Sequence, residues 1–148
     1  EIDYCEYLIA FRPKKVNKTV TVFLRHKGKI LLLKRSSNKH IHHPNEWSTV
    51  TGYLNEMSSL KRAYMEIEEE TGIKKNQLKL VKKGKELRIN DRACNKTWLT
   101  TSMLFETKTR KVKLDYEHLK YKWIKPEELN KLKCIIGLEK SLNAVLSP

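Results

Sequence analysis

Cysteine, proline, glycine and long apolar runs are all scarce in this sequence, and each shortage excludes a class of protein. Three cysteines without paired spacing exclude a disulfide scaffold and are typical of a reducing cytoplasm. Five glycines and four prolines exclude collagen-like and low-complexity chains. Apolar runs such as residues 30–33 are far shorter than the ~20 residues of a membrane helix, and no signal-peptide pattern opens the chain. We therefore expect a cytoplasmic protein without a membrane partner.

Negative charge is also in short supply. The 31 Lys and Arg residues outnumber the 17 Asp and Glu residues, which leaves a net charge of +14. Such an excess attracts polyanions such as nucleotides and RNA, but a lysine-rich solubility surface explains it equally well. The length of 148 residues suits one domain. We expect a single domain over residues 1–148, in which residues 1–18 form an N-terminal extension or an edge strand.

Short β-branched and apolar segments predict strands that are interleaved with helices. A hairpin is expected over residues 19–35, with its turn at residues 26–29. Further strands are expected at residues 4–11, 47–50, 78–89, 97–106, 111–114 and 121–124. Helices are expected at residues 59–71 and 138–146, and Pro126 suits the first turn of another. Regular strand–helix–strand units are missing, which predicts an α/β protein with a mixed sheet.

The clearest predicted helix spans residues 59–71. Ser58 or Ser59 can cap its start, and Gly72 can end it in the left-handed conformation. Its buried stripe is expected to consist of the apolar residues that recur at spacings of three and four, which are Leu60, Ala63, Tyr64 and Ile67.

Four glutamates crowd the last turns of this helix. Glu66, Glu69 and Glu70 share one face because they are three and four residues apart, whereas Glu68 points elsewhere. Like charges at this spacing cost about 0.2–0.5 kcal/mol per pair. A divalent cation reverses that cost, and Mg²⁺ takes carboxylate oxygens together with water and substrate phosphate. Taken alone, the helix leaves a solvated acidic face open as the alternative.

The segment around these acids resembles the signature of the Nudix hydrolase family. That signature is a glycine, five residues, a glutamate, seven residues, Arg-Glu, an aliphatic residue, one residue, Glu-Glu, one residue, a glycine and an aliphatic residue. Its second half matches residues 65–73, except that Met65 replaces the arginine. In its first half, Gly52 and Glu56 are each displaced by one position, in opposite directions. A one-residue rearrangement of the loop before the helix would align both.

Three other segments extend the resemblance over about residues 19–146. They are the opening hairpin, the strand at residues 47–54, and the closing stretch that ends in Pro-Glu-Glu-Leu at residues 126–129. The Val-x-Gly-Tyr-Leu form of residues 50–54 is similar to archaeal-type members. The resemblance implies a Nudix-like α/β/α sandwich with a mixed β-sheet, acting as a monomer or homodimer. It also implies an enzyme that uses Mg²⁺ or Mn²⁺ to hydrolyse the pyrophosphate link of nucleoside diphosphate derivatives.

The resemblance also implies which residues form the active site. The expected metal ligands are Gly52, through its carbonyl, and Glu56, Glu66, Glu69 and Glu70. Arg62 precedes Glu66 by four residues and can replace the family arginine that orients these carboxylates, although a solvent-facing arginine is an equal alternative. Glu117 lies in a late loop where some family members place a further metal ligand or base.

Substrate contacts are less clearly marked in the sequence. Lys34 and Arg35 end the second strand of the hairpin and can meet substrate phosphates. Trp47, Tyr53 and Trp98 can stack on a base, although aromatic residues near strands usually belong to the core.

The histidines of the chain carry weaker indications of a site. His40, His42 and His43 share a polar loop without a cysteine or a spaced partner, so a solvated loop is favoured over a metal site. For His118, beside Glu117, a structural role at a strand end is favoured over a phosphate contact.

Two other functions remain open at this stage. The net charge of +14 and the basic stretches at residues 79–88 and 108–113 suit an RNA 5′-end pyrophosphohydrolase or an RNA-binding Nudix protein. Met65 and the displaced first half of the signature suit a catalytically weak nucleotide sensor. The identity of the nucleotide derivative is not marked by any residue that we find.

Overall fold

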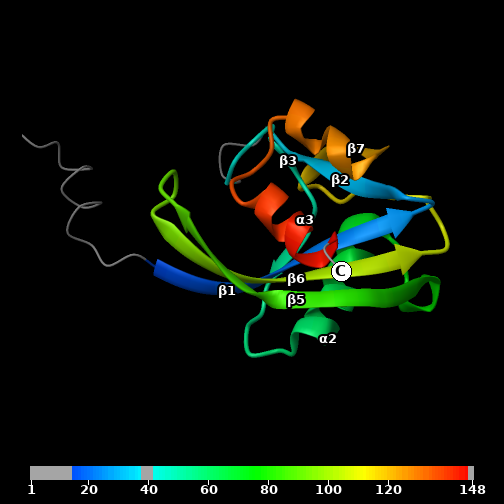
Figure 1. Ribbon diagram of the computed structural model, residues 1–148, viewed down its shortest axis with the longest axis horizontal. Helices are drawn as coiled ribbons and strands as arrows, with labels where there is room; N and C mark the ends of the chain where they lie inside the picture. The colour runs from blue at the N-terminus through cyan, green and yellow to red at the C-terminus, as the bar shows by residue number, and fades with distance from the viewer. Residues whose placement is uncertain (1–14, 38–41, 147–148) are drawn as a thin grey trace, which may run out of the picture.

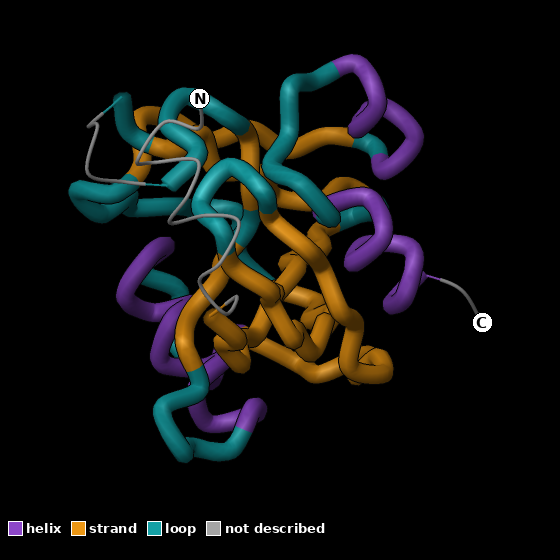
Figure 2. The backbone as a smooth tube through the Cα atoms, turned by 90° about the vertical axis from the view of Figure 1, so that its left-hand side faces the viewer, coloured by secondary structure: helices purple, strands orange, loops and turns teal. Residues whose placement is uncertain are grey.

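A mixed sheet of seven strands lies between helices that cover its two faces (Figures 1 and 2). The computed structural model describes residues 15–37 and 42–146, so the strand expected at residues 4–11 lies outside the described residues. In chain order, the strands are β1 (Lys15–His26), β2 (Lys29–Arg35), β3 (Trp47–Ser48), β4 (Val50–Tyr53), β5 (Leu78–Asp91), β6 (Lys96–Thr107) and β7 (His118–Ile124). The helical segments are α2 (Ser59–Thr71), η1 (Lys75–Gln77), η2 (Pro126–Lys131) and α3 (Leu138–Leu146). This arrangement confirms the predicted α/β/α sandwich.

Strand β1 runs through the middle of the sheet. It pairs antiparallel with β2 beside the turn and with β4 further along, and it pairs parallel with β6 over residues 15–25. The remaining order is β3-β2-β1-β6-β5, and β7 pairs with β2. The predicted hairpin and the predicted mixture of parallel and antiparallel strands are both confirmed. Strand β1 begins at Lys15, four residues before the predicted start.

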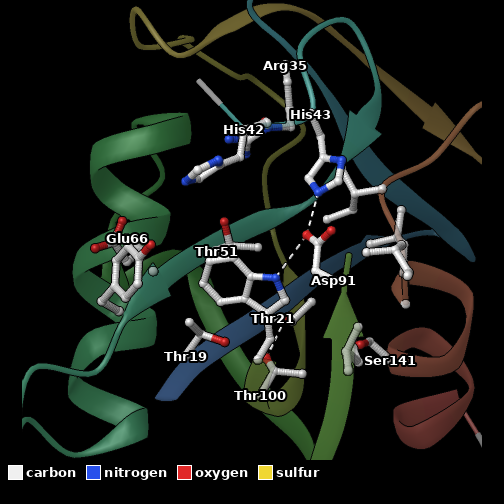
Figure 3. Close-up of a pocket in the computed structure, with 18 of the residues that line it drawn as sticks. Thr19, Thr21, Arg35, His42, His43, Thr51, Glu66, Asp91, Thr100 and Ser141 are labelled. Carbon is white, nitrogen blue, oxygen red and sulfur yellow. Dashed lines mark hydrogen bonds and ion pairs between the residues drawn. The ribbon is translucent and has the colours of Figure 1, made fainter. Parts of the chain in front are cut away.

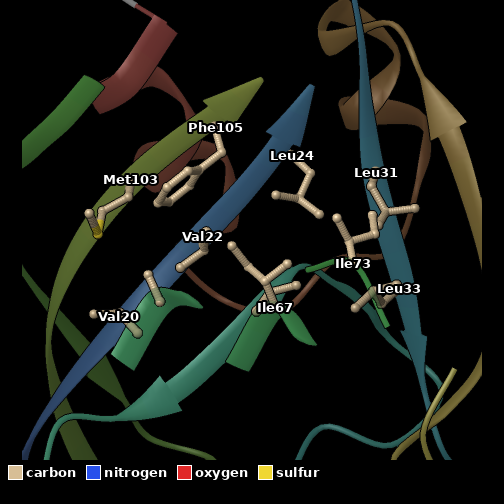
Figure 4. Close-up of a cluster of buried hydrophobic side chains, with 11 residues drawn as sticks. Val20, Val22, Leu24, Leu31, Leu33, Ile67, Ile73, Met103 and Phe105 are labelled. Atoms are coloured by element: carbon tan, nitrogen blue, oxygen red, sulfur yellow. The ribbon is translucent and has the colours of Figure 1, made fainter. Parts of the chain in front are cut away.

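Both faces of the central strands are buried, on two separate cores. Side chains alternate along a strand, so Val20, Val22 and Leu24 pack on the face that α2 covers (Figure 4), while Phe23 packs on the opposite face. Strands β2 and β6 alternate in the same way, with Leu33 on the first core and Leu104 on the second. Each fully buried aliphatic side chain contributes about 1.5–3 kcal/mol, so the two cores together hold the sandwich.

Helix α2 begins and ends where the sequence predicts. The side chain of Ser58 accepts a hydrogen bond from the Lys61 backbone N–H at 3.3 Å. Gly72 has a φ of 75°, and its N–H donates to the Glu68 carbonyl, which closes the last turn. The predicted stripe is narrower than expected, because Ala63 is fully buried whereas Leu60 is 40% exposed.

The strand predicted at residues 111–114 is wrong. This segment has no strand pairing, and its Lys113 N–H donates instead to the Thr71 carbonyl at the end of α2, at 2.9 Å. Val112 and Leu114 pack against the first core, which explains their apolar character. The segment therefore secures the end of α2 rather than extending the sheet.

Helix α3 and the short helix η2 cover the second face. Leu138, Leu142 and Val145 of α3 pack against Phe23 and Leu104 of the sheet. Proline at the first position and two glutamates in the first turn start η2, as the sequence predicts. Within residues 15–37 and 42–146, no helix is long and apolar enough to cross a membrane.

Candidate active site

A cavity of about 420 Å³ opens over the same sheet face that α3 covers further along (Figure 3). Its floor consists of alternate residues on four strands, which are Thr19, Thr21, Thr51, Tyr53, Ile89, Asp91, Trp98 and Thr100. The Thr21 and Thr100 hydroxyl groups share a hydrogen bond of 2.6 Å. Threonines take positions on β1 that share a face with Phe23. Small polar side chains therefore leave room where the second core ends.

The acidic end of α2 forms one wall of the cavity. Glu66 and Glu69 line it, as does Arg62 one turn earlier. Glu70 lies behind them and is only 2% exposed, whereas Glu68 is exposed on another side of the helix. The three-residue face predicted from the helical spacing is thus split between two lining carboxylates and one buried carboxylate.

Glu66 reaches the cavity past Gly52 of β4. A Cβ atom at position 52 would lie 2.5 Å from the Cδ of Glu66 and 2.7 Å from its Oε1. Side chains on β4 alternate, so Thr51 and Tyr53 belong to the cavity floor while position 52 faces α2. Only a glycine at position 52 leaves space for the Glu66 carboxylate in this place.

Glu66 and Glu70, the two inner carboxylates of the site, concentrate negative charge unfavourably. Burial, followed by repulsion from Glu66, raises the pKa of Glu70 well above its ordinary value. Burial also raises the pKa of Glu66, although contacts with Glu70 and Arg62 oppose that rise. The Oε2 atom of Glu70 is buried without a hydrogen-bond partner among the described residues. A cation beside these groups would relieve both the repulsion and the unpaired oxygen.

Two basic side chains accompany the carboxylates. The Arg62 Nη1 lies 3.3 Å from Glu66 Oε1, and both side chains are 14% exposed. His118 is buried with its Nδ1 at 2.8 Å from Asp115 Oδ1, and its Nε2 lies 3.6 Å from Glu70 Oε1. Each inner carboxylate is therefore approached by one basic side chain.

Arg35 and Glu117 belong to a further part of the lining. The Arg35 Nε donates to the His42 carbonyl at 2.6 Å, which holds the guanidinium in place. Burial lowers the pKa of Arg35, while the carboxylates of Glu117 and Glu70 oppose that shift. An arginine in this position presents a cation to any anionic group that enters the cavity.

Comparison with known proteins decides the family. A model of the NUDIX domain matches residues 15–143, which is most of the chain. The chain belongs to the Nudix family. No curated protein matches the sequence significantly.

Solved structures share the Nudix fold over most of this chain. An Ap4A hydrolase of C. elegans, in a binary complex, has a TM-score of 0.69 at 21% identity, covering 86% of this chain and 93% of its own. The MutT protein of Methanosarcina mazei Go1 has a TM-score of 0.68 at 25% identity, with coverages of 88% and 92%. A MutT NUDIX hydrolase of Burkholderia pseudomallei has a TM-score of 0.69 at 20% identity, with coverages of 88% and 98%.

Several candidate residues from the sequence do not come to the cavity. Trp47 is 7% exposed and packs in the second core, with Lys122 Nζ 4.8 Å from its ring centre. Lys34 pairs with Trp47 across β2 and β3 and is absent from the described lining. Glu56 is exposed, with a φ of 65°, in the loop before α2, and only its neighbour Asn55 lines the cavity. The stacking role expected of Trp47 is therefore wrong, because its ring is covered by the core.

This chain has Met65 in place of the signature arginine, and Arg62 contacts Glu66 instead. Met65 is 44% exposed, so a side chain at that site starts on the solvent side of α2. Arg62, one turn earlier, makes the contact with Glu66. The alternative of a solvent-facing Arg62 does not fit a side chain that is only 14% exposed.

Sequence reasoning missed three residues of the cavity lining. His42, His43 and Asp91 line it, although the sequence favours a solvated loop for the two histidines. The loop folds back over the β5–β6 hairpin, where Lys96 Nζ lies 3.0 Å from His42 Nε2. Alternation along β5 marks Asp91 as a partner of Ile89 on one face, but nothing local links it to the loop.

Proposed function

We propose that this chain is a Mg²⁺-dependent hydrolase that splits the pyrophosphate link of a nucleoside diphosphate derivative. The products are a nucleoside monophosphate and the phosphorylated second group. The observation that carries this proposal is the wall of Glu66 and Glu69 in one cavity with Arg35, backed by the buried Glu70, whose Oε2 has no hydrogen-bond partner among the described residues. Carboxylates attract the metal, and the arginine attracts the phosphates that accompany it.

The carboxylates of α2 fit a hard divalent cation. Mg²⁺ prefers a few carboxylate oxygens and takes the rest of its octahedron from water and phosphate. Glu66 and Glu69 offer such oxygens at the cavity surface, and Glu70 offers a buried oxygen without a hydrogen bond. When bound, the metal would neutralise the diphosphate and lower the pKa of a water molecule. Mn²⁺ has the same ligand preference and is an acceptable replacement.

The surrounding side chains divide the remaining tasks. Arg62 orients the carboxylate of Glu66 through their ion pair. Arg35 binds a phosphate oxygen of the substrate, since its guanidinium lines the cavity beside Glu117. The Glu117 carboxylate accepts the proton of the attacking water as general base, because it lines the cavity outside the crowded α2 wall.

The cavity floor suits the nucleoside part of the substrate. The rings of Tyr53 and Trp98 lie 5.9 Å apart at 52°, so a base can stack on one ring and contact the other edge-on. Thr19, Thr51 and Thr100 add hydroxyl groups to the same floor. A flat base with polar edges fits a floor that combines aromatic faces with hydroxyl groups.

Hydrolysis of a panel of nucleoside diphosphate derivatives, nucleoside triphosphates and capped RNA, with and without Mg²⁺, tests the proposal. Glu66→Gln and Glu69→Gln should lower kcat by orders of magnitude, because each removes a charged ligand. Glu68→Gln is the matched control, since Glu68 is exposed on another side of the same helix. Near-wild-type turnover in both lining variants, or equal turnover without a divalent ion, would contradict the proposal.

An RNA substrate is the second candidate, and strand β5 favours it. This strand forms one edge of the sheet and exposes Lys79, Lys83, Lys85 and Arg88. Phosphate contacts along such an edge would make RNA binding strongly dependent on salt. Preference for capped RNA over free nucleotides in the panel would establish this candidate.

A further inference from the structure

Three metal-ligating side chains meet on the side of the cavity away from α2, where His43 and Asp91 belong to its lining. His43 comes from the loop after β2, Asp91 from the end of β5, and Cys94 from the turn between β5 and β6. Their ligand atoms all lie within 4.8 Å of one another. Figure 3 shows His43 and Asp91 directed at each other, across the cavity from Glu66. The cluster is thus separate from the carboxylates of the Nudix signature.

His43 lies between two carboxylates. Its Nδ1 is 3.0 Å from Glu46 Oε2, and its Nε2 is 2.5 Å from Asp91 Oδ2. Carboxylates only accept hydrogen bonds, and a neutral imidazole has one N–H to donate. The other ring nitrogen of His43 therefore faces a carboxylate oxygen with no proton between them, unless a cation occupies that place. That cation is either an additional proton or a metal ion.

The neighbours of the pair favour a metal ion. The Oδ2 of Asp91 also accepts a hydrogen bond from Trp98 Nε1 at 3.1 Å, which fixes the direction of the carboxylate. Glu46 fixes the ring of His43 in the way that a carboxylate orients a metal-bound histidine. A thiol, an imidazole and a carboxylate together form a ligand set typical of Zn²⁺ and other borderline transition ions.

We propose that His43 Nε2, an Asp91 carboxylate oxygen and Cys94 Sγ form a second metal site, which takes Zn²⁺ or a similar transition ion. His43 and Asp91 line the cavity, so the fourth position faces the space where substrate binds. Three protein ligands with one open position are typical of zinc sites that bind water or substrate. Mg²⁺, which prefers oxygen ligands alone, belongs to the carboxylates of α2 instead.

A tetrahedral ion requires the three ligand atoms, which now lie within 4.8 Å of one another, to shift by about 1 Å. With Zn–N and Zn–O bonds near 2.0–2.1 Å, the nitrogen and oxygen would stand about 3.3 Å apart. His43 Nε2 and Asp91 Oδ2, now 2.5 Å apart, would separate by about 0.8 Å. Rotation of the His43 side chain on its loop provides that movement. On binding, Cys94 Sγ loses its proton to solvent and bonds the ion as thiolate.

Cobalt(II) titration of the full chain in excess Mg²⁺ tests this site, because Co²⁺ replaces Zn²⁺ and reports its ligands by colour. We expect one equivalent to give intense visible bands of a tetrahedral ion and a thiolate-to-cobalt charge-transfer band in the near ultraviolet, both lost on adding Zn²⁺. Cys94→Ser should remove the charge-transfer band. Cys134→Ser and Cys5→Ser, the matched controls, should keep it. Glu46→Gln should keep the band but weaken Co²⁺ affinity about 10–100-fold.

Other outcomes would overturn the proposal. They are an absent band in the wild-type chain, a band that survives in Cys94→Ser, or a band that Cys134→Ser removes. Glu69→Gln tests this site independently of the proposed function, because that variant should lose hydrolysis and keep the cobalt band. Circular dichroism of each variant shows that a lost band reflects a lost ligand rather than a lost fold.

Discussion

Replacement of Gly52 by alanine tests whether the position of Glu66 controls activity. The added Cβ would lie 2.5 Å from the Cγ and Cδ of Glu66, whereas non-bonded carbons approach to about 3.5 Å. Glu66 must therefore move by about 1 Å. A misplacement of that size costs about 100-fold in rate, which is about 2.7 kcal/mol of transition-state stabilisation.

The fold should survive this change. The backbone of Gly52 lies outside the left-handed region, so alanine adopts it without strain and gains about 0.4–1 kcal/mol from a less flexible unfolded chain. Crowding of Glu66 costs about 1–3 kcal/mol. The net loss of unfolding free energy is therefore about 0–2.6 kcal/mol, which a domain of this size tolerates.

Steady-state kinetics measure the rate, electron paramagnetic resonance measures the Mn²⁺ affinity, and thermal unfolding measures the stability. Gly84→Ala is the matched control, because its Cβ would meet no atom closer than 3.4 Å. We expect Gly52→Ala to lose about two orders of magnitude in kcat, together with Mn²⁺ affinity, while Gly84→Ala keeps both. Full activity and full Mn²⁺ affinity in a folded Gly52→Ala variant would refute the argument that this glycine makes room for a metal ligand.

The remaining predictions concern charge. Glu70→Gln should raise the melting temperature of the metal-free protein at pH 7. The pKa of buried Glu70 is raised above the ordinary glutamate value of 4.5, so wild-type stability falls as the pH rises above 4.5. The same pH dependence of the melting temperature in both proteins would contradict this. Arg62→Ala should reduce turnover more at limiting than at saturating Mg²⁺, with only partial rescue by Arg62→Lys, because an ammonium lacks the two-pronged geometry of a guanidinium; a silent Arg62→Ala together with a tenfold gain in Met65→Arg would favour the weak-sensor alternative. Single-stranded RNA should bind weakly, with affinity falling with salt at a slope near −0.7 per phosphate contact; a flat response would assign the net charge of +14 to solubility.

Local chemistry made much of the fold predictable from the sequence. Helix α2 begins after Ser58 and ends before Gly72 as predicted, because a side-chain cap and a left-handed glycine act within one turn of the chain. The β1–β2 hairpin follows in the same way from its turn at residues 26–29. The family signature requires only the order of residues, so the family was also visible before the fold.

Tertiary structure decided which side chains share the cavity. Spacing on α2 places Glu66, Glu69 and Glu70 on one face, but burial of Glu70 depends on what packs against that face. The burial of Trp47 in the second core was equally unpredictable, since nothing local distinguishes a core tryptophan from one that stacks on a base.

The cluster of His43, Asp91 and Cys94 shows most clearly why the sequence alone could not predict the cavity. About fifty residues separate His43 from its two partners, and no spacing rule connects them. They meet because β6 pairs parallel with β1 and antiparallel with β5, which brings the β5–β6 turn under the loop after β2. The sequence by itself determined the ends of α2, the hairpin and the family. Strand pairing between distant segments determined the cavity and the groups that face each other across it.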